Sequence, residues 1–298
     1  MKRTVQFLLI DGTASGRIQA KLDNWTGVAY RIPRLLLAES KDREDLRYCG
    51  VYFLFGLNEE SGEDVVYIGQ ARERKNGESL LARFAEHSRS ESKNFCNEIV
   101  FFTTTTDDFG PTELCYLENR FWQLASNAKR FQLVNGNEPS MGNVTEAKQA
   151  ELDRYIENAK ILMNTFGYRI FEAVVPSSTE YEEKSIGFTL ERTARSGVHV
   201  RAEGLWTNEG FVVLNGSELL EGERSGLQKA SRDLRARLCA NGVIERTSEG
   251  ILRLKEDQLF ASPSAAGCFV IGGACNGRAA WKTRDGKTFA EVEASNET

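Results

Sequence analysis

The sequence predicts an α+β protein with two domains, and three observations support this prediction. In the first hundred positions, short segments rich in Val, Ile and Phe alternate with turn residues, which is typical of antiparallel strands. Residues 112–129 and 145–166 instead carry apolar side chains at helical spacing. This periodicity stops at Pro176-Ser177-Ser178-Thr179-Glu180, whose composition is that of a linker. The expected parts are an N-terminal hairpin extension at 1–47, a domain at 48–175, a linker at 176–184 and a C-terminal α+β domain at 185–298.

The N-terminal elements follow from apolar patterning and from turn and capping residues. Asp11-Gly12 and Ser15-Gly16 separate two alternating segments, which predicts a β-hairpin. Thr112 and Thr145 are good N-cap residues for the two long helices. In chain order, the elements are strands Thr4–Ile10 and Arg17–Leu22, a helix-forming run Leu35–Ser40, strands Val51–Phe55 and Val65–Ile68, a helix Ser79–Arg89, a strand Glu98–Thr104, and helices from Thr112 to about Lys129 and from Thr145 to about Phe166.

After the linker, glycines interrupt strand-like segments, and one basic helix is predicted at Ser225–Asn241. This helix ends at Asn241-Gly242, a pair that commonly ends helices. The other expected elements are strands Phe188–Glu191, Val198–Ala202, Phe211–Leu214 and Ile251–Leu254, the small-residue run Ala261–Cys275 and the segment Trp281-Lys282-Thr283.

The composition argues against several classes of protein. The longest apolar runs, such as Val51–Phe55, are far shorter than the roughly 20 residues that cross a bilayer, so no membrane partner is expected. The apolar stretch after Met1-Lys2-Arg3 ends too soon for a secretory signal. The cysteines form no C-x-x-C pair and have only His87 and His199 as companions, which argues against a zinc site or a disulfide framework. These features favour a cytoplasmic protein.

Charge is distributed unevenly along the chain. The net charge of −5 argues against a protein that coats nucleic acid without selectivity. Between Arg224 and Lys287, however, twelve Lys and Arg residues accompany six Asp and Glu residues. This basic region indicates that the C-terminal domain contacts phosphates, with Arg232, Arg235 and Lys282 as candidate nucleic-acid contacts. A solvated helix face with charged loops explains the same charges equally well.

Two short motifs, Gly50-Val51-Tyr52 and Tyr67-Ile68-Gly69, flank the turn-rich stretch 58–64 and precede a basic and an acidic helix. In this order they resemble the GIY-YIG nuclease family, over about residues 48–139. The resemblance implies a small antiparallel three-stranded sheet flanked by helices, and hydrolysis of phosphodiester bonds in DNA rather than RNA. The C-terminal domain resembles an uncharacterised domain that often follows such modules in bacterial proteins.

The resemblance assigns roles to residues near these motifs. Tyr52 and Tyr67 would lie near the scissile phosphate, and either could act as general base once its pKa, about 10 in free tyrosine, is lowered. Arg83 and His87 share one face of the predicted helix, and Arg83 would bind the phosphate through its planar fork. The alternatives are ordinary strand tyrosines and a surface ion pair of Arg83.

Glu118 is the clearest local anomaly, because it falls on the apolar face of the helix that begins at Thr112. A carboxylate that faces a core needs a partner. A single Mg²⁺ or Mn²⁺ ion, completed by waters and phosphate oxygens, is one such partner, and the resemblance implies it. A salt bridge to Arg83 is the structural alternative. Glu113, in the first turn, is better explained by the helix dipole.

The resemblance also implies an asparagine after the acidic helix, where Asn135 matches best and Asn137 is the alternative. An ordinary turn would explain both residues. Together these residues predict a metal-dependent endonuclease. Two alternative functions remain open: a nucleic-acid-binding protein without catalytic turnover, and an interaction scaffold for a basic partner protein. The sequence also leaves open whether the protein forms a homodimer and in which pathway it acts.

Overall fold

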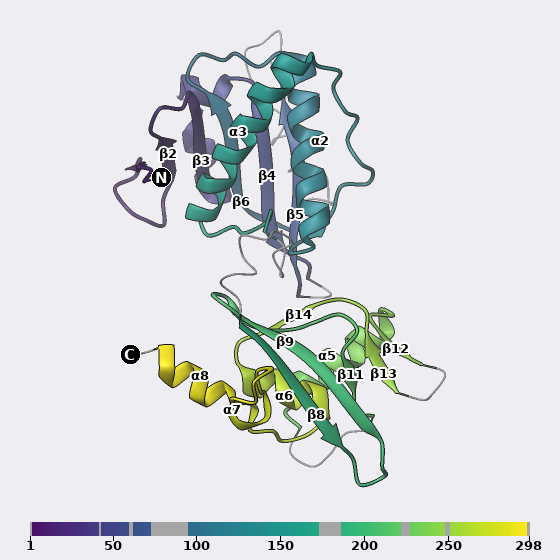
Figure 1. Cartoon of the computed structure of the whole chain (residues 1–298). Helices are drawn as coiled ribbons and strands as arrows, with labels where there is room; N and C mark the ends of the chain where they lie inside the picture. The colour runs from purple at the N-terminus through teal and green to yellow at the C-terminus, as the bar shows by residue number, and fades with distance from the viewer. Residues whose placement is uncertain are drawn as a thin grey trace. The chain divides into compact units, whose positions relative to one another are not determined.

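The computed structural model describes residues 2–41, 43–59, 62–72, 95–172, 186–221, 227–247 and 251–296. The chain divides into two compact units, Met1–Ala173 and Val174–Thr298 (Figure 1). Both units combine antiparallel strands with helices, and six α-helices occur in these described ranges, as expected for an α+β protein. None of the described helices is both long and apolar enough to cross a lipid bilayer.

Unit 1 is built on a seven-stranded sheet of order β1-β2-β3-β6-β4-β5-β7. Neighbouring strands are antiparallel except β5 and β7, which are parallel. The expected three-stranded sheet is therefore too small, because β6, β4 and β5 are adjacent but four further strands extend the sheet. The strands are β1 (Val5–Leu9), β2 (Ile18–Leu22), β3 (Gly27–Pro33), β4 (Gly50–Leu57), β5 (Asp64–Ala71), β6 (Cys96–Thr104) and β7 (Gln132–Leu133).

The predicted N-terminal hairpin is formed by β1 and β2, and β3 joins it to the rest of the sheet. Strand β3 was not predicted, because Gly27, Arg31 and Pro33 interrupt its apolar pattern. It is nevertheless paired with β6 along its whole length, from Gly27 opposite Thr104 to Pro33 opposite Glu98. Pairing with β2 and β6 on its two sides therefore stabilises a segment with a weak local signal.

Helices α2 (Pro111–Ala128) and α3 (Glu146–Thr165) cover one face of this sheet (Figure 1). The N-cap of α2 is Gly110 rather than the predicted Thr112, because the proline that follows Gly110 suits the first helical position. The predicted cap Thr145 is confirmed, since its hydroxyl accepts a hydrogen bond from a backbone N–H of the first turn. The apolar sides of both helices and the facing strand residues form one core.

The opposite face of the sheet is covered by the segment that precedes β4. The run Leu35–Ser40, predicted as helical, contains two short 3-10 turns rather than an α-helix. Leu37 and Leu46 are buried here against strand residues that include Tyr52. The turns of this segment are η1 (Arg34–Leu36), η2 (Ala38–Ser40) and η3 (Glu44–Arg47).

Unit 2 contains a four-stranded sheet, β14-β10-β9-β8, and a three-stranded sheet, β11-β13-β12. The predicted basic helix is observed as α5 (Lys229–Ala240), and the small-residue run contains α6 (Pro263–Ile271). These elements pack around a core of their own, in which Trp281 is fully buried. The other elements are β8 (Ile186–Thr193), β9 (His199–Thr207), β10 (Gly210–Val213), β11 (Glu218–Leu219), β12 (Ile244–Arg246), β13 (Leu252–Leu254), β14 (Gln258–Phe260), α7 (Gly277–Ala280) and α8 (Phe289–Asn296).

Candidate functional site

The two motif strands lie side by side in the sheet of unit 1. β4 pairs with β5 so that Tyr52 is opposite Gly69 and Leu54 is opposite Tyr67. This register places the rings of Tyr52 and Tyr67 on one face, with ring centroids 6.1 Å apart. A Cβ atom at Gly69 would lie 2.5 Å from the Tyr52 Oη atom, so the Tyr52 ring can cross β5 only because residue 69 has no side chain. The two predicted tyrosines therefore meet around Gly69.

The two tyrosines differ in their access to solvent. Tyr52 is only 2% exposed and belongs to the core beneath the 3-10 turns, together with Leu46 and Phe101. Tyr67 is half-buried at the margin of the same core. Of this pair, only Tyr67 can therefore meet water or a substrate in this conformation.

Asn135 contacts the centre of the second motif. Its Oδ1 atom accepts a hydrogen bond from the Ile68 N–H at 3.1 Å, and its Nδ2 atom donates to the Ile68 carbonyl at 2.8 Å. The side chain thus continues the parallel pairing that β7 makes with β5 at Val66. Asn137 is exposed and makes no hydrogen bond in the described part of the chain. Of the two alternatives, Asn135 is the asparagine that holds the strand carrying Tyr67.

Glu118 contacts β5 from the other face of the sheet. Its Oε2 atom accepts a hydrogen bond from Gln70 Nε2 at 2.6 Å. Arg72 joins this cluster, because its Nε atom donates to Gln70 Oε1 at 2.7 Å and its Nη2 atom lies 3.0 Å from Cys115 Sγ. Side chains alternate along a strand, so Gln70 faces α2 and the tyrosines lie on the opposite face. Glu118 therefore lies on one face of β5, and Tyr52 and Tyr67 lie on the other face.

One side chain of this cluster suits a hard divalent cation. Glu118 supplies a carboxylate, and one carboxylate completed by waters and phosphate oxygens is a common arrangement for Mg²⁺, whereas Gln70 directs its Nε2 atom toward Glu118 and its Oε1 atom toward Arg72. Within the described ranges, no three His, Cys, Asp or Glu side chains gather to form a site that binds a cation through protein ligands alone. Arg72 is exposed and adds positive charge beside Gln70, which favours an anion such as phosphate at the same place.

Arg83 and His87 lie outside the described residues, as does the predicted helix that carries them. Gln70, Arg72 and Cys115 were not predicted as site residues. The sequence gives only a weak indication of this cluster. Gln70 and Arg72 are two residues apart on a strand, so their side chains are expected on one face of the sheet. Only the packing of α2 against the sheet decides that this face of β5 contacts α2.

The residues predicted to contact nucleic acid in unit 2 lie in different environments. Arg232 and Lys282 are exposed. Arg235 is buried, and its guanidinium donates hydrogen bonds of 2.5 Å to the backbone carbonyls of Phe269 and Leu220. This corrects the prediction for Arg235, because a guanidinium that holds α5 against the core of unit 2 cannot face a phosphate.

Comparison with known proteins identifies a family for part of unit 2. Residues 193–293 match a family described as a domain of unknown function, DUF4357. This confirms the predicted uncharacterised domain at the C-terminal end. The GIY-YIG family was not matched, so that resemblance stays a prediction. No curated protein and no solved structure matched the chain.

Proposed function

We propose that unit 1 is a metal-dependent nuclease that hydrolyses phosphodiester bonds in DNA at the edge of β5. One observation carries this proposal: three residues to which the resemblance assigns roles converge on residues 67–70, which are the second motif and the residue after it. Asn135 binds the backbone of this segment, the Tyr52 ring crosses it, and Glu118 accepts a hydrogen bond from its last residue. Such convergence is expected where a strand is held in place to support a site.

The edge of β5 is where groups from both faces could reach one phosphate. The contacts of β7 and Asn135 with β5 extend to Ile68, and no strand covers this edge beyond Ile68 among the described residues. Gly69 follows and is itself buried, with the Tyr52 ring lying against it, so an approach would be to the side chains that flank this edge. A phosphate at this edge would have Tyr67 on one face and Glu118 on the other.

In this mechanism, Tyr67 loses its own proton first, and its phenolate then accepts a proton from the attacking water. Tyr67 is assigned this role because it is the tyrosine with access to solvent. Arg72 offsets negative charge on the phosphate, and the resemblance places Arg83 in the same role. Glu118 would hold Mg²⁺ or Mn²⁺, with Gln70 positioning its carboxylate, and the positive charge of the ion would stabilise the phosphate oxygens in the transition state.

Cleavage of supercoiled plasmid, single-stranded DNA and branched DNA with Mg²⁺ or Mn²⁺ tests this proposal. Glu118→Gln keeps the size of the side chain and an oxygen that accepts a hydrogen bond, but removes the negative charge. We expect the cleavage rate to fall at least about 100-fold. Glu113→Gln is the matched control, because it makes the same change in the first turn of the same helix. Cleavage at an unchanged rate in Glu118→Gln would contradict the proposal.

Nucleic-acid binding without cleavage is the second candidate function. It is favoured by the burial of Tyr52 and by the separation of Glu118 from both tyrosines across the sheet. If no substrate is cleaved while the wild type and both glutamate variants bind DNA equally, the chain binds nucleic acid without cleaving it.

A further inference from the structure

A cavity in unit 2 lies beside the turn that joins β8 to β9. Its volume of about 840 Å³ is within the range of known ligand sites, and its lining includes residues of this turn and of β11. The turn has a defined backbone, because the Ala194 N–H donates a hydrogen bond to the Val198 carbonyl at 2.7 Å. Gly197 supplies the positive φ, 86°, that this turn requires. The turn therefore presents its side chains to the cavity from a fixed backbone.

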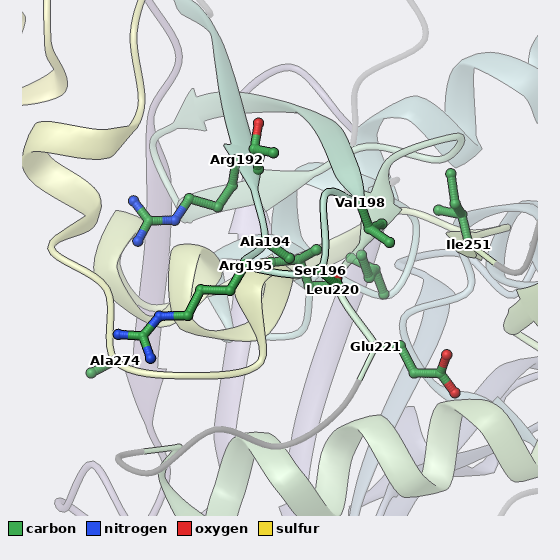
Figure 2. Close-up of a pocket in the computed structure, with 11 residues that line it drawn as sticks. Arg192, Ala194, Arg195, Ser196, Val198, Leu220, Glu221, Ile251 and Ala274 are labelled. Atoms are coloured by element: carbon green, nitrogen blue, oxygen red, sulfur yellow. The ribbon is translucent and has the colours of Figure 1, made fainter.

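Arg192 and Arg195 extend toward the same side of this cavity (Figure 2). Neither guanidinium forms an ion pair or donates a hydrogen bond in the described part of the chain. Unpaired guanidiniums beside a cavity favour an anionic ligand, for which their planar forks are suited. Four other exposed arginines of unit 2 are paired with carboxylates, whereas the exposed Arg284 forms no ion pair within the described residues. The pairs are Arg201 with Glu191 and Glu203, Arg246 with Glu221, Arg253 with Glu218, and Arg278 with Glu293.

Apolar side chains also line the cavity. Val198 and Leu220 lie between the arginines and Ile251, which lies on the far side together with Glu221 (Figure 2). The Glu221 carboxylate is paired with Arg246, so it does not neutralise the arginines of the turn. The cavity thus combines two arginines on one side with apolar side chains farther from them.

We propose that this cavity binds single-stranded DNA, with backbone phosphates on Arg192 and Arg195 and an unstacked base against Val198 and Ile251. The bases of a single strand are free to enter a cavity, whereas those of a duplex are stacked and paired. A small inorganic anion would leave Val198 and Ile251 uncovered. The inference rests on the proposed function only for the choice of DNA as ligand. It adds to that function that unit 2 binds the single-stranded DNA.

Fluorescence anisotropy of the full chain with a labelled single strand tests this inference, in EDTA so that metal-dependent cleavage cannot occur. Each phosphate contact on a single strand contributes about 0.7 to the slope of log affinity against log salt. Replacing both arginines, in Arg192→Ala/Arg195→Ala, should therefore lower the magnitude of this slope by about 1.4. At 0.1 M salt, binding should weaken about 25-fold. Val198→Asn should weaken binding without changing the slope, because it removes an apolar contact and no charge.

The matched control is Arg253→Ala/Arg278→Ala, which removes the same charge from paired arginines of the same unit. All the exchanged residues are exposed, and thermal unfolding checks that each variant is folded. An equal loss of binding in the control and in the test variant would overturn the inference, since it would reflect net charge alone. Duplex DNA bound as tightly as the single strand, or a phosphopeptide bound more tightly, would also overturn it. The anisotropy experiment contains no divalent cation, so it is independent of the cleavage assay. A negative binding result therefore leaves the cleavage proposal intact, and a negative cleavage result leaves this inference intact.

Discussion

Replacing Gly69 with alanine should destabilise unit 1, because other atoms already occupy the space that a Cβ atom needs. The Cβ position lies 2.5 Å from Tyr52 Oη, 2.6 Å from Tyr52 Cζ and 2.8 Å from Tyr67 Cε1. Comfortable contacts between carbon atoms are about 3.5–4.0 Å long, so the rings would have to move by about 1 Å. Tyr52 has little room for this movement, because it is buried in a core.

Forcing an extra methyl group into a packed core costs about 1–3 kcal/mol, and we expect the free energy of unfolding of unit 1 to fall by about 2 kcal/mol. Tyr52→Phe should not relieve the clash, because the Cζ atom remains. Tyr52→Leu should relieve the two shortest contacts, because leucine lacks both the Cζ and the Oη atoms, and it leaves the 2.8 Å contact with the half-buried Tyr67 ring. In a Tyr52→Leu background, Gly69→Ala should therefore cost about 1 kcal/mol less than in the wild type, which makes the two substitutions coupled.

Amide hydrogen exchange measures this effect, because peptides from β4 and β6 report on unit 1 separately from unit 2. Gly136→Ala is the matched control in the same unit, since its Cβ atom would have no neighbour within 4 Å. We expect that control to change stability by less than about 0.5 kcal/mol. Unchanged protection in Gly69→Ala, or an equal cost in both Tyr52 backgrounds, would refute the close approach of the Tyr52 ring to residue 69.

Two further predictions concern unit 1. Asn135→Ala should lower its stability by about 1–2 kcal/mol, because both hydrogen bonds to the backbone of β5 are lost, while Asn137→Ala should change little. Hydrogen exchange in β5 compares the two variants, and equal effects would contradict the role of Asn135. Hydrogen bonds from Arg17 lower the pKa of Asp11 from 3.8 to about 2, so the stabilising contribution of this carboxylate is complete above about pH 4 and is lost as the pH falls through 2. An NMR titration should give this pKa in the wild type and a value nearer 3.8 in Arg17→Gln, whereas a wild-type pKa of 3.8 would count against the ion pair.

Local signals predicted elements well where neighbours in the chain decide the structure. The cap at Thr145 and the helix after it depend on one hydroxyl and on apolar spacing within the same segment. The run Leu35–Ser40 shows the limit of such signals, because good helix formers there instead make 3-10 turns that bury Leu37 against the sheet. Packing against a partner outweighs helix propensity in that segment.

By itself, the sequence determined the α+β class, the strands that carry the two motifs, the long helix α3 and the position of the C-terminal domain of unknown function. Apolar spacing, turn residues and caps are local, so they can be recognised without knowing what the segment will contact. The tertiary structure alone decided that Tyr52 is buried while Tyr67 is half-buried, that Glu118 meets Gln70, and that Arg235 turns inward. Each of these outcomes depends on strand register and on helix packing between segments far apart in the chain, and no local pattern specifies which of those segments come into contact.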